Sequence, residues 1–397
     1  MKLSEKSLFN LSKHKYSGID DSLLAKYVLQ KYWNFALKFL PLNIAPNLVT
    51  LTGTIAIVVT FLIVAYYSPF LTGTLPTWLY VLCGLSLFFY QTMDNLDGKQ
   101  ARRTNSSSAL GQLFDHGCDS LVCMFQSLSQ ASVGQYGTGS LALVQLFIAT
   151  FLPFWMATWE EYHTGTLHLG KFNGPDEGII IIVLSCFVTA YFGGDIWVQK
   201  LSYFIPKSQE SMWISILPQG LLQLQLNQLT VSLLAIPCII TCYFNIQNVV
   251  KHLRAKNQPI FPAIKHILVW VLVFTFSLSW YYTSTSFYNL SSVWHQYPRT
   301  TQYTIGIIFG ELVSRLIIAH MCHDSYAIIQ KPIIPLILIS IFSNLTFYLQ
   351  RELVPEYILL FIFTIYCSIQ YSLFVRDIVK QLCAFLKIKC FSIAKQH

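Results

Sequence analysis

Apolar runs of about 20 residues recur along this 397-residue chain, and they constrain its fold more than any other feature. A helix of that length spans the ~30 Å hydrocarbon core of a bilayer. Hydrophobic residues make up 54% of the chain and charged residues only 11%, whereas a soluble domain usually carries about 25% charged residues. The sequence therefore predicts an all-α, polytopic membrane helix bundle.

We predict about ten transmembrane helices. Their expected ranges are 47–66, 77–93, 110–132, 140–157, 179–196, 229–247, 264–282, 303–321, 333–349 and 357–375. Residues 22–39 mix apolar side chains with lysines, which predicts an N-terminal interfacial amphipathic helix; packing of this helix on the bundle is the alternative. The expected organisation is a cytosolic N-terminus (1–45), one membrane domain (46–380) and a basic cytosolic tail (381–397).

The distribution of basic residues predicts the orientation of the chain. If both termini are cytosolic, only Lys200, Lys207, Arg299 and Arg351 of the 26 Lys and Arg residues lie on the lumenal side, and Arg315 lies within a span. Such an asymmetry follows the positive-inside rule. The positive charges are scattered over loops without a basic groove, so we expect membrane lipid and no nucleic acid as a partner.

A polar stretch between two of the apolar runs predicts the functional site. Residues 94–119 read DNLDGKQARRTNSSSALGQLFDHGCD, with the pattern D-x2-D-G-x2-A-R-x8-G-x3-D-x3-D. The pattern is filled by Asp94, Asp97, Gly98, Ala101, Arg102, Gly111, Asp115 and Asp119. Because carboxylates near hydrocarbon are costly, a cluster of them at a membrane indicates a functional site.

The spacing of the aspartates predicts that they meet. Asp94 and Asp97 are three residues apart and Asp115 and Asp119 are four apart, so each pair shares one helix face. Asp94 lies about 27 Å along its helix, which places it at the cytosolic membrane face. The polar turn at 104–108 folds the two helices together. Small residues let their backbones approach closely, namely Gly98, Ala101 and Gly111.

Four carboxylates at one place would repel each other unless cations joined them. Oxygen ligands that act together with substrate phosphates favour Mg²⁺, with Mn²⁺ as the other candidate. We therefore predict two divalent ions held by Asp94, Asp97, Asp115 and Asp119, with the Arg102 guanidinium binding phosphate. An ion-binding transporter is an alternative, but transporter sites usually lie near the membrane midplane.

A general base is also needed if the acceptor is a hydroxyl group. His116 follows Asp115 directly, and an ordinary histidine pKa of about 6.5 suits proton transfer near neutral pH. Asp119 is the second candidate for this role. Gln112 lies four residues before His116 on the same helix face, where it would orient the imidazole ring. Elsewhere, Glu160 and Glu161 either shape the pocket or are solvated loop charges.

The aspartate pattern resembles the signature of the CDP-alcohol phosphotransferases. LFDHGCDS (113–120), APNLVTLTG (45–53) and WEEYHTGTL (159–167), followed by GPDEG (174–178), are similar to the eukaryotic choline/ethanolamine phosphotransferases. The resemblance implies transfer from CDP-ethanolamine or CDP-choline to diacylglycerol, with release of CMP, as the last step of phosphatidylethanolamine or phosphatidylcholine synthesis. It also implies the endoplasmic reticulum membrane, extending to the Golgi.

The resemblance further implies which residues lie near the substrate. The candidate substrate-binding residues are Asn47, Gly98, Ala101, Arg102, Asn105 and Gly111. Asn47 and Asn105 would lie near the nucleotide or diphosphate, and the outer spans would serve as the surface of a homodimer. One position departs from the family pattern, because relatives commonly carry a glutamate where this chain has Gln112. Glutamine adds no charge, so we expect a weaker base.

Several alternatives stay open from the sequence. A phosphatidyltransferase would use CDP-diacylglycerol with a soluble alcohol such as inositol, although the ten spans and the LFDHGCDS stretch argue against it. A catalytically silent relative is a further alternative, for which Gln112 is the hint. The sequence does not decide between ethanolamine and choline.

Overall fold

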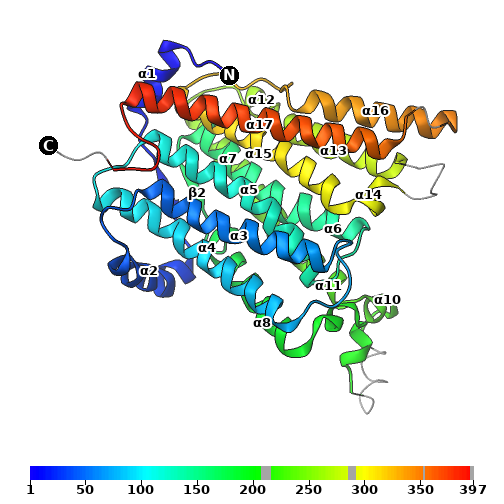
Figure 1. Cartoon of the computed structure of the whole chain (residues 1–397). Coiled ribbons are helices and arrows are strands. Elements are labelled where there is room, and N and C mark those ends of the chain that lie inside the picture. Colours follow the sequence, from blue (N-terminus) through cyan, green and yellow to red (C-terminus); the bar gives the residue numbers. More distant parts are fainter. Residues whose placement is uncertain (207–215, 285–291, 352–353, 394–397) are drawn as a thin grey trace.

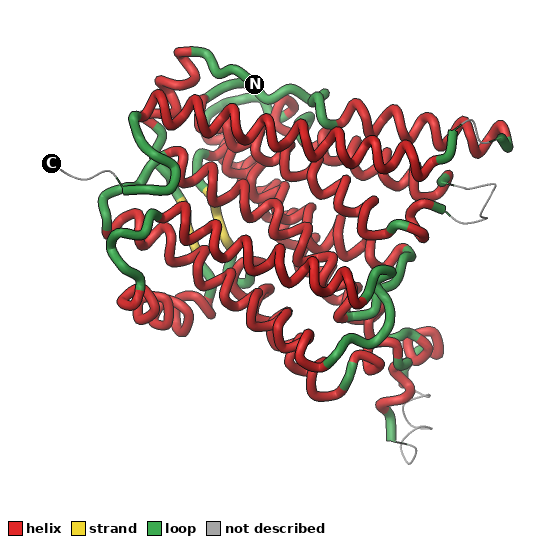
Figure 2. The backbone as a smooth tube through the Cα atoms, viewed as in Figure 1, coloured by secondary structure: helices red, strands yellow, loops and turns green. Residues whose placement is uncertain are grey.

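The protein is a bundle of long helices that run roughly side by side (Figure 1). The computed structural model describes residues 1–206, 216–284, 292–351 and 354–393. Within these residues only two short strands occur, β1 (Gly18–Asp20) and β2 (Leu167–Leu169), which pair in parallel (Figure 2). The predicted all-α membrane bundle is confirmed.

Each of the ten predicted spans coincides with a helix or with consecutive helical segments. The segments are α3 (Pro46–Tyr67), α4 (Thr77–Arg103), α5 (Ala109–Val133), α6 with η3 and α7 (Ser140–Val144, Gln145–Phe151, Leu152–Thr164), η4 with α8 (Gly174–Gly178, Ile179–Phe192), α11 (Leu226–Ala255), α12 and α13 (Phe261–Ile264, Ile267–Thr283), α15 (Pro298–Cys322), α16 (Ile333–Leu349) and α17 (Glu356–Leu386).

Seven of these ten are long and apolar enough to cross a membrane. The other three are α4 and α5, which carry the polar motif, and α16, which has 17 residues. Short helical segments connect or flank the spans, namely α1 (Glu5–Lys13), η1 (Ala25–Leu29), α2 (Gln30–Ala36), η2 (Leu37–Phe39), η5 (Gly194–Val198), η6 (Leu201–Phe204), α10 (Gln219–Gln223) and α14 (Val293–Gln296).

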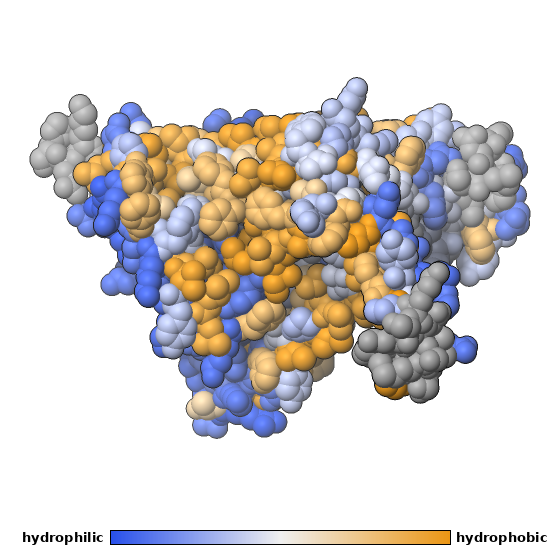
Figure 3. Space-filling model, turned by 90° about the horizontal axis from the view of Figure 1, so that it is seen from below, coloured by the Kyte–Doolittle hydropathy of each residue, from blue (hydrophilic) through white to orange (hydrophobic). Residues whose placement is uncertain are grey.

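Helix α15 forms the core of the bundle. Of its most apolar window, 94% is buried inside the protein, and the ring of Phe309 stacks on Phe151 of η3 at a centroid distance of 4.1 Å. The outer helices instead expose apolar side chains. Figure 3 shows a broad apolar surface on one face, flanked by hydrophilic residues. A surface of this kind is suited to contact with lipid.

The segment at 22–39 is helical as η1, α2 and η2, and it packs beside α4. Trp33 is only 1% exposed and packs in a cluster with Val49 and Leu96, whereas Tyr27 and Phe39 are 61% and 72% exposed. The helix therefore buries one apolar face on the bundle and presents others outward. Packing on the bundle is confirmed, and a place in the membrane interface stays a prediction.

Candidate active site

The turn between α4 and α5 brings the motif together. Helix α4 ends at Arg103, and Asn105 has a φ of +51°, a left-handed conformation that asparagine tolerates better than most residues. Ser108 then caps α5, because its hydroxyl accepts a 3.1 Å hydrogen bond from the amide of Gly111. The chain thus reverses within a few residues, but α4 and α5 then pack mainly on α3 and little on each other. The predicted close approach of their backbones at Gly98, Ala101 and Gly111 is therefore wrong, since Gly98 faces Arg102 of its own helix and Gly111 faces Asn47 of α3.

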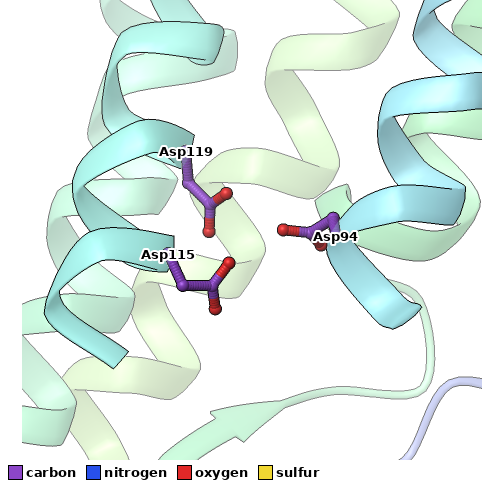
Figure 4. A group of neighbouring side chains, drawn as sticks. All are labelled: Asp94, Asp115 and Asp119. Carbon is purple, nitrogen blue, oxygen red and sulfur yellow. The ribbon is translucent and has the colours of Figure 1, made fainter. Parts of the chain in front are cut away.

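Three of the four predicted metal ligands point toward a common space (Figure 4). Asp94 comes from α4, and Asp115 and Asp119 come from α5, and one carboxylate oxygen of each lies within 4.8 Å of the others. Asp97 is not one of these three, but its carboxylate lies against that of Asp115. The Oδ2 atom of Asp97 accepts a hydrogen bond from the hydroxyl of Thr50 on α3.

The three carboxylates supply oxygen ligands of the kind that a divalent cation requires. Oδ1 of Asp94 and Oδ1 of Asp115 are buried and have no hydrogen-bond partner in the described part of the chain. Leaving charged oxygens buried without a partner is costly. An oxygen-only donor set suits Mg²⁺ or Mn²⁺, which bind carboxylates and complete their coordination with water or substrate phosphate. The residues present therefore fit a metal site.

Two hydroxyl groups that the sequence analysis missed hold the aspartates in place. The Tyr90 hydroxyl donates a 2.5 Å hydrogen bond to Oδ1 of Asp119, and Thr50 donates to Asp97. The sequence contains only weak signals for the roles of these two residues. Tyr90 precedes Asp94 by one helical turn, and Thr50 lies in the APNLVTLTG stretch. Partners of this kind fix the orientation of metal-binding carboxylates.

His116 lies next to the carboxylates. Its Nε2 atom is 3.9 Å from Oδ2 of Asp115, and its side chain is 13% exposed. The ring of Tyr16, from the N-terminal segment, meets it edge to face at a centroid distance of 6.0 Å. The position of His116 suits a proton acceptor beside a metal-bound substrate.

Gln112 lies in a partly buried chain of hydrogen-bonded polar side chains. Its Oε1 is 2.8 Å from Nε2 of His14, and its Nε2 donates a 3.0 Å hydrogen bond to Oε1 of Glu161. Glu161 is only 2% exposed, and so is Glu160, which accepts hydrogen bonds from Asn245 and Asn248. The two glutamates are therefore buried groups and not solvated loop charges. That Gln112 orients His116 stays a prediction.

The remaining candidates lie at the same end of the bundle. Nδ2 of Asn47 donates a 3.0 Å hydrogen bond to the carbonyl of Cys390, and Oδ1 of Asn47 lies 3.6 Å from the position a Cβ would take at Gly111. Arg102 is exposed on the last turn of α4, and its Nη1 lies 3.5 Å from the corresponding position at Gly98. Ala101 belongs to the same turn, where its carbonyl accepts from Ser106.

Two titratable groups outside the spans lie against the site. Loss of contact with water raises the pKa of the Tyr16 phenol, and the carboxylates of Glu161 and Asp115 raise it further, so the phenol stays protonated. Burial lowers the pKa of His14. Its bond to Gln112 opposes this shift, and the charge of His323 adds to it. The His14 imidazole is therefore neutral at pH 7.

Comparison with known proteins gives a consistent result. Residues 43–205 match the family model described as CDP-alcohol phosphatidyltransferase. The chain is 61% identical to CDP-alcohol phosphatidyltransferase class-I family protein 3 of Dictyostelium discoideum, over 100% of this chain and 99% of that protein. It is 36% identical to choline/ethanolaminephosphotransferase 1 of Arabidopsis thaliana (98% and 97%) and 28% identical to human ethanolaminephosphotransferase 1 (100% and 95%).

Proposed function

Because the chain belongs to the CDP-alcohol phosphatidyltransferase family, we propose that it transfers phosphoethanolamine or phosphocholine from the CDP-alcohol to diacylglycerol and releases CMP. This would be the last step of phosphatidylethanolamine or phosphatidylcholine synthesis. The observation that carries the proposal is the group of Asp94, Asp115 and Asp119, whose carboxylates lie within 4.8 Å of one another. The name of the Arabidopsis relative contains both head groups, which supports testing both.

The proposed step exchanges a phosphoanhydride bond for a phosphoester bond. The diacylglycerol hydroxyl oxygen bonds to the phosphorus that carries the alcohol, and the bond from this phosphorus to the CMP oxygen breaks. His116 accepts the hydroxyl proton, with Asp119 as the second candidate. His116 is suited to this role because its Nε2 lies 3.9 Å from Asp115, beside the three carboxylates, and His116 is not one of the three grouped residues.

The proposed metal ligands are Asp94, Asp97, Asp115 and Asp119, and they would hold two Mg²⁺ or Mn²⁺ ions. The ions would neutralise the diphosphate and stabilise the leaving phosphate. Arg102, at the end of α4, would bind phosphate oxygens, and Asn47 and Asn105 would lie near the nucleotide. Gly98, Ala101 and Gly111 would leave room for the substrate at the helix turn.

The setting of the enzyme is part of the same proposal. We expect a multi-pass protein of the endoplasmic reticulum membrane with both termini in the cytosol. The soluble CDP-alcohol would then arrive from the cytosol and diacylglycerol from within the bilayer. A homodimer built on the outer spans is expected as well.

The test is an assay of purified protein in lipid nanodiscs with diacylglycerol and Mg²⁺. CDP-ethanolamine and CDP-choline are supplied separately, and CMP and phospholipid are both measured. We expect equal amounts of CMP and phospholipid with at least one CDP-alcohol, and loss of both products in Asp94→Asn. Product formed only from CDP-diacylglycerol and inositol would establish the alternative phosphatidyltransferase instead. Cation flux without any transfer would establish a transporter.

A further inference from the structure

Residues 1–22 form an N-terminal strap, and its first half is hydrogen-bonded to α17, to the end of α15 and to the residue that follows α15 closely, Asp324. The Leu3 amide donates a 2.9 Å hydrogen bond to Gln381 on α17, and the Ser7 hydroxyl donates one of 2.8 Å to Asp324. Asn10 donates to the carbonyl of Cys322 at 2.8 Å. Leu11 is fully buried. Helix α1 is thus anchored on the α15 and α17 side of the bundle.

The second half of the strap is hydrogen-bonded to β2 and η4, on the other side of the site. Strand β1 pairs with β2, which follows α7, and the amide of Asp21 donates a 2.9 Å hydrogen bond to Leu169. The hydroxyl of Ser22 donates a 2.6 Å hydrogen bond to Glu177 in η4. The residues between the two anchors therefore cross the end of the bundle where the carboxylates lie.

Two side chains of this crossing contact catalytic candidates. His14 bonds to Gln112, and the Tyr16 ring meets the His116 ring at an interplanar angle of 86°. Tyr16 is 53% exposed, so its side chain, which contacts His116, is also partly in contact with solvent. Its hydroxyl lies 2.5 Å from the position that a Cβ would take at Gly18. A side chain at position 18 would therefore require the Tyr16 ring to shift.

We propose that the N-terminal strap closes the reaction space against water, and that Tyr16 is a positioning residue that holds His116 toward the lipid hydroxyl. This inference rests on the proposed function. Water competes with diacylglycerol for the same phosphorus. Its attack would form phosphoethanolamine or phosphocholine and CMP, and its proton would pass to the same base. A closed site prevents this side reaction, and an aromatic cap over the base serves that purpose.

The experiment compares hydrolysis with transfer in the full-length protein. Nanodisc samples receive CDP-ethanolamine or CDP-choline with diacylglycerol and Mg²⁺, and the ratio of free phosphoalcohol to phospholipid is measured. We expect Tyr16→Ala to raise this ratio about tenfold, the equivalent of about 1.4 kcal/mol in relative barrier height. Tyr16→Phe keeps the ring and should keep the wild-type ratio. Phe9→Ala, an exposed position on α1, is the matched control.

A second variant keeps the test independent of folding problems. Gly18→Val retains Tyr16 but displaces its ring, and it should raise the ratio in the same direction as Tyr16→Ala. If the strap does not close the site, Tyr16→Ala and Gly18→Val should reduce transfer and hydrolysis in the same proportion. The ratio of free phosphoalcohol to phospholipid would then stay unchanged, and that result would overturn the inference. Absence of transfer by the wild-type protein would instead count against the proposed function.

Discussion

The Tyr90 hydroxyl on α4 donates a 2.5 Å hydrogen bond to Oδ1 of Asp119 on α5. This bond links the two helices that supply the carboxylates at the depth where the carboxylates meet. It also occupies Oδ1 of Asp119, whose carboxylate is directed toward Asp94 and Asp115 (Figure 4). The placement of Asp119 thus depends on a residue that is not itself an acid.

Replacement of Tyr90 by phenylalanine should therefore weaken metal binding. We expect Tyr90→Phe to raise the Mg²⁺ concentration for half-maximal activity about tenfold. Loss of a hydrogen-bond partner of a metal-binding carboxylate typically lowers metal affinity by about that factor or more. The measurement is a Mg²⁺ titration of the transfer rate. Tyr80→Phe is the control, since the Tyr80 hydroxyl on the same helix accepts a bond from the Leu75 amide, away from the aspartates. An equal shift in both variants would show a general effect on the helix.

Removal of the divalent metal should abolish the transfer reaction. We expect chelation to stop turnover and added Mg²⁺ or Mn²⁺ to restore it, and Asp115→Asn to lower the rate about a thousandfold, which corresponds to about 4 kcal/mol.

The same variant gives a second result without substrate. In the metal-free protein the carboxylates of Asp94, Asp115 and Asp119 repel each other. Asp115→Asn removes one charge, so it should raise the melting temperature in chelator and reduce the gain in melting temperature that Mg²⁺ gives to the wild type. A melting temperature that responds to Mg²⁺ equally in both proteins would contradict the assignment of Asp115 as a ligand.

The sequence predicted the helices well because lipid leaves few alternatives to a helix of sufficient length. The spacing of Asp94, Asp115 and Asp119 also predicted their meeting, since it depends only on helix geometry and a short turn. Asp97 shows the limit of such reasoning. It is on the expected helix and lies against Asp115, but it also accepts a hydrogen bond from Thr50 of a third helix, and no local spacing reveals that contact.

The N-terminal strap was beyond prediction for a related reason. Its α1 helix is polar and short, and its partner Asp324 lies 317 residues away from Ser7 in sequence. The buried Glu161 likewise accepts a hydrogen bond from Gln112 in another helix. Contacts of this kind follow from the arrangement of the whole bundle, whereas patterns in sequence report mainly on the neighbouring turns of one helix.

A negative charge at position 112 should change the pH dependence of transfer. If His116 is the base, Gln112→Glu places a carboxylate one turn away on the same face and raises the pKa of the base. The base must be unprotonated to act, so the acidic limb of kcat/KM should move to higher pH. The structure adds a second effect, because a glutamate there would lie close to Glu161, which now accepts a 3.0 Å hydrogen bond from Gln112.

The profile of Gln112→Glu is best compared with that of Glu161→Gln and of the double variant. The double variant removes the repulsion between the two carboxylates while keeping the new charge near His116. It should therefore show the shifted acidic limb together with a recovered maximal rate. If Gln112→Glu has the same acidic limb and the same rate as the wild type, the hypothesis that glutamine at position 112 weakens the base is wrong.

Acidification should weaken the attachment of the strap through His14. Burial lowers the pKa of this histidine, so the folded protein binds the proton less readily than the unfolded chain does. The stability that His14 contributes is therefore fully present above a pH of about 6.5, the ordinary histidine value, and is lost as the pH falls toward the lower pKa of the folded state. The groups that face His14 are Gln112, His320 at a ring distance of 5.2 Å, and His323.

The measurement is the melting temperature of the full-length protein in detergent at pH 7.5 and pH 5.5. The wild type should lose more stability over this interval than His14→Gln, because the variant has no imidazole to protonate at this position. Both proteins keep His320 and His323, so the difference between them reports the imidazole at position 14 together with its interaction with these two histidines. An equal loss in the two proteins would show that the acid sensitivity of the strap lies elsewhere, and a larger loss in His14→Gln would reverse the sign of the proposed coupling.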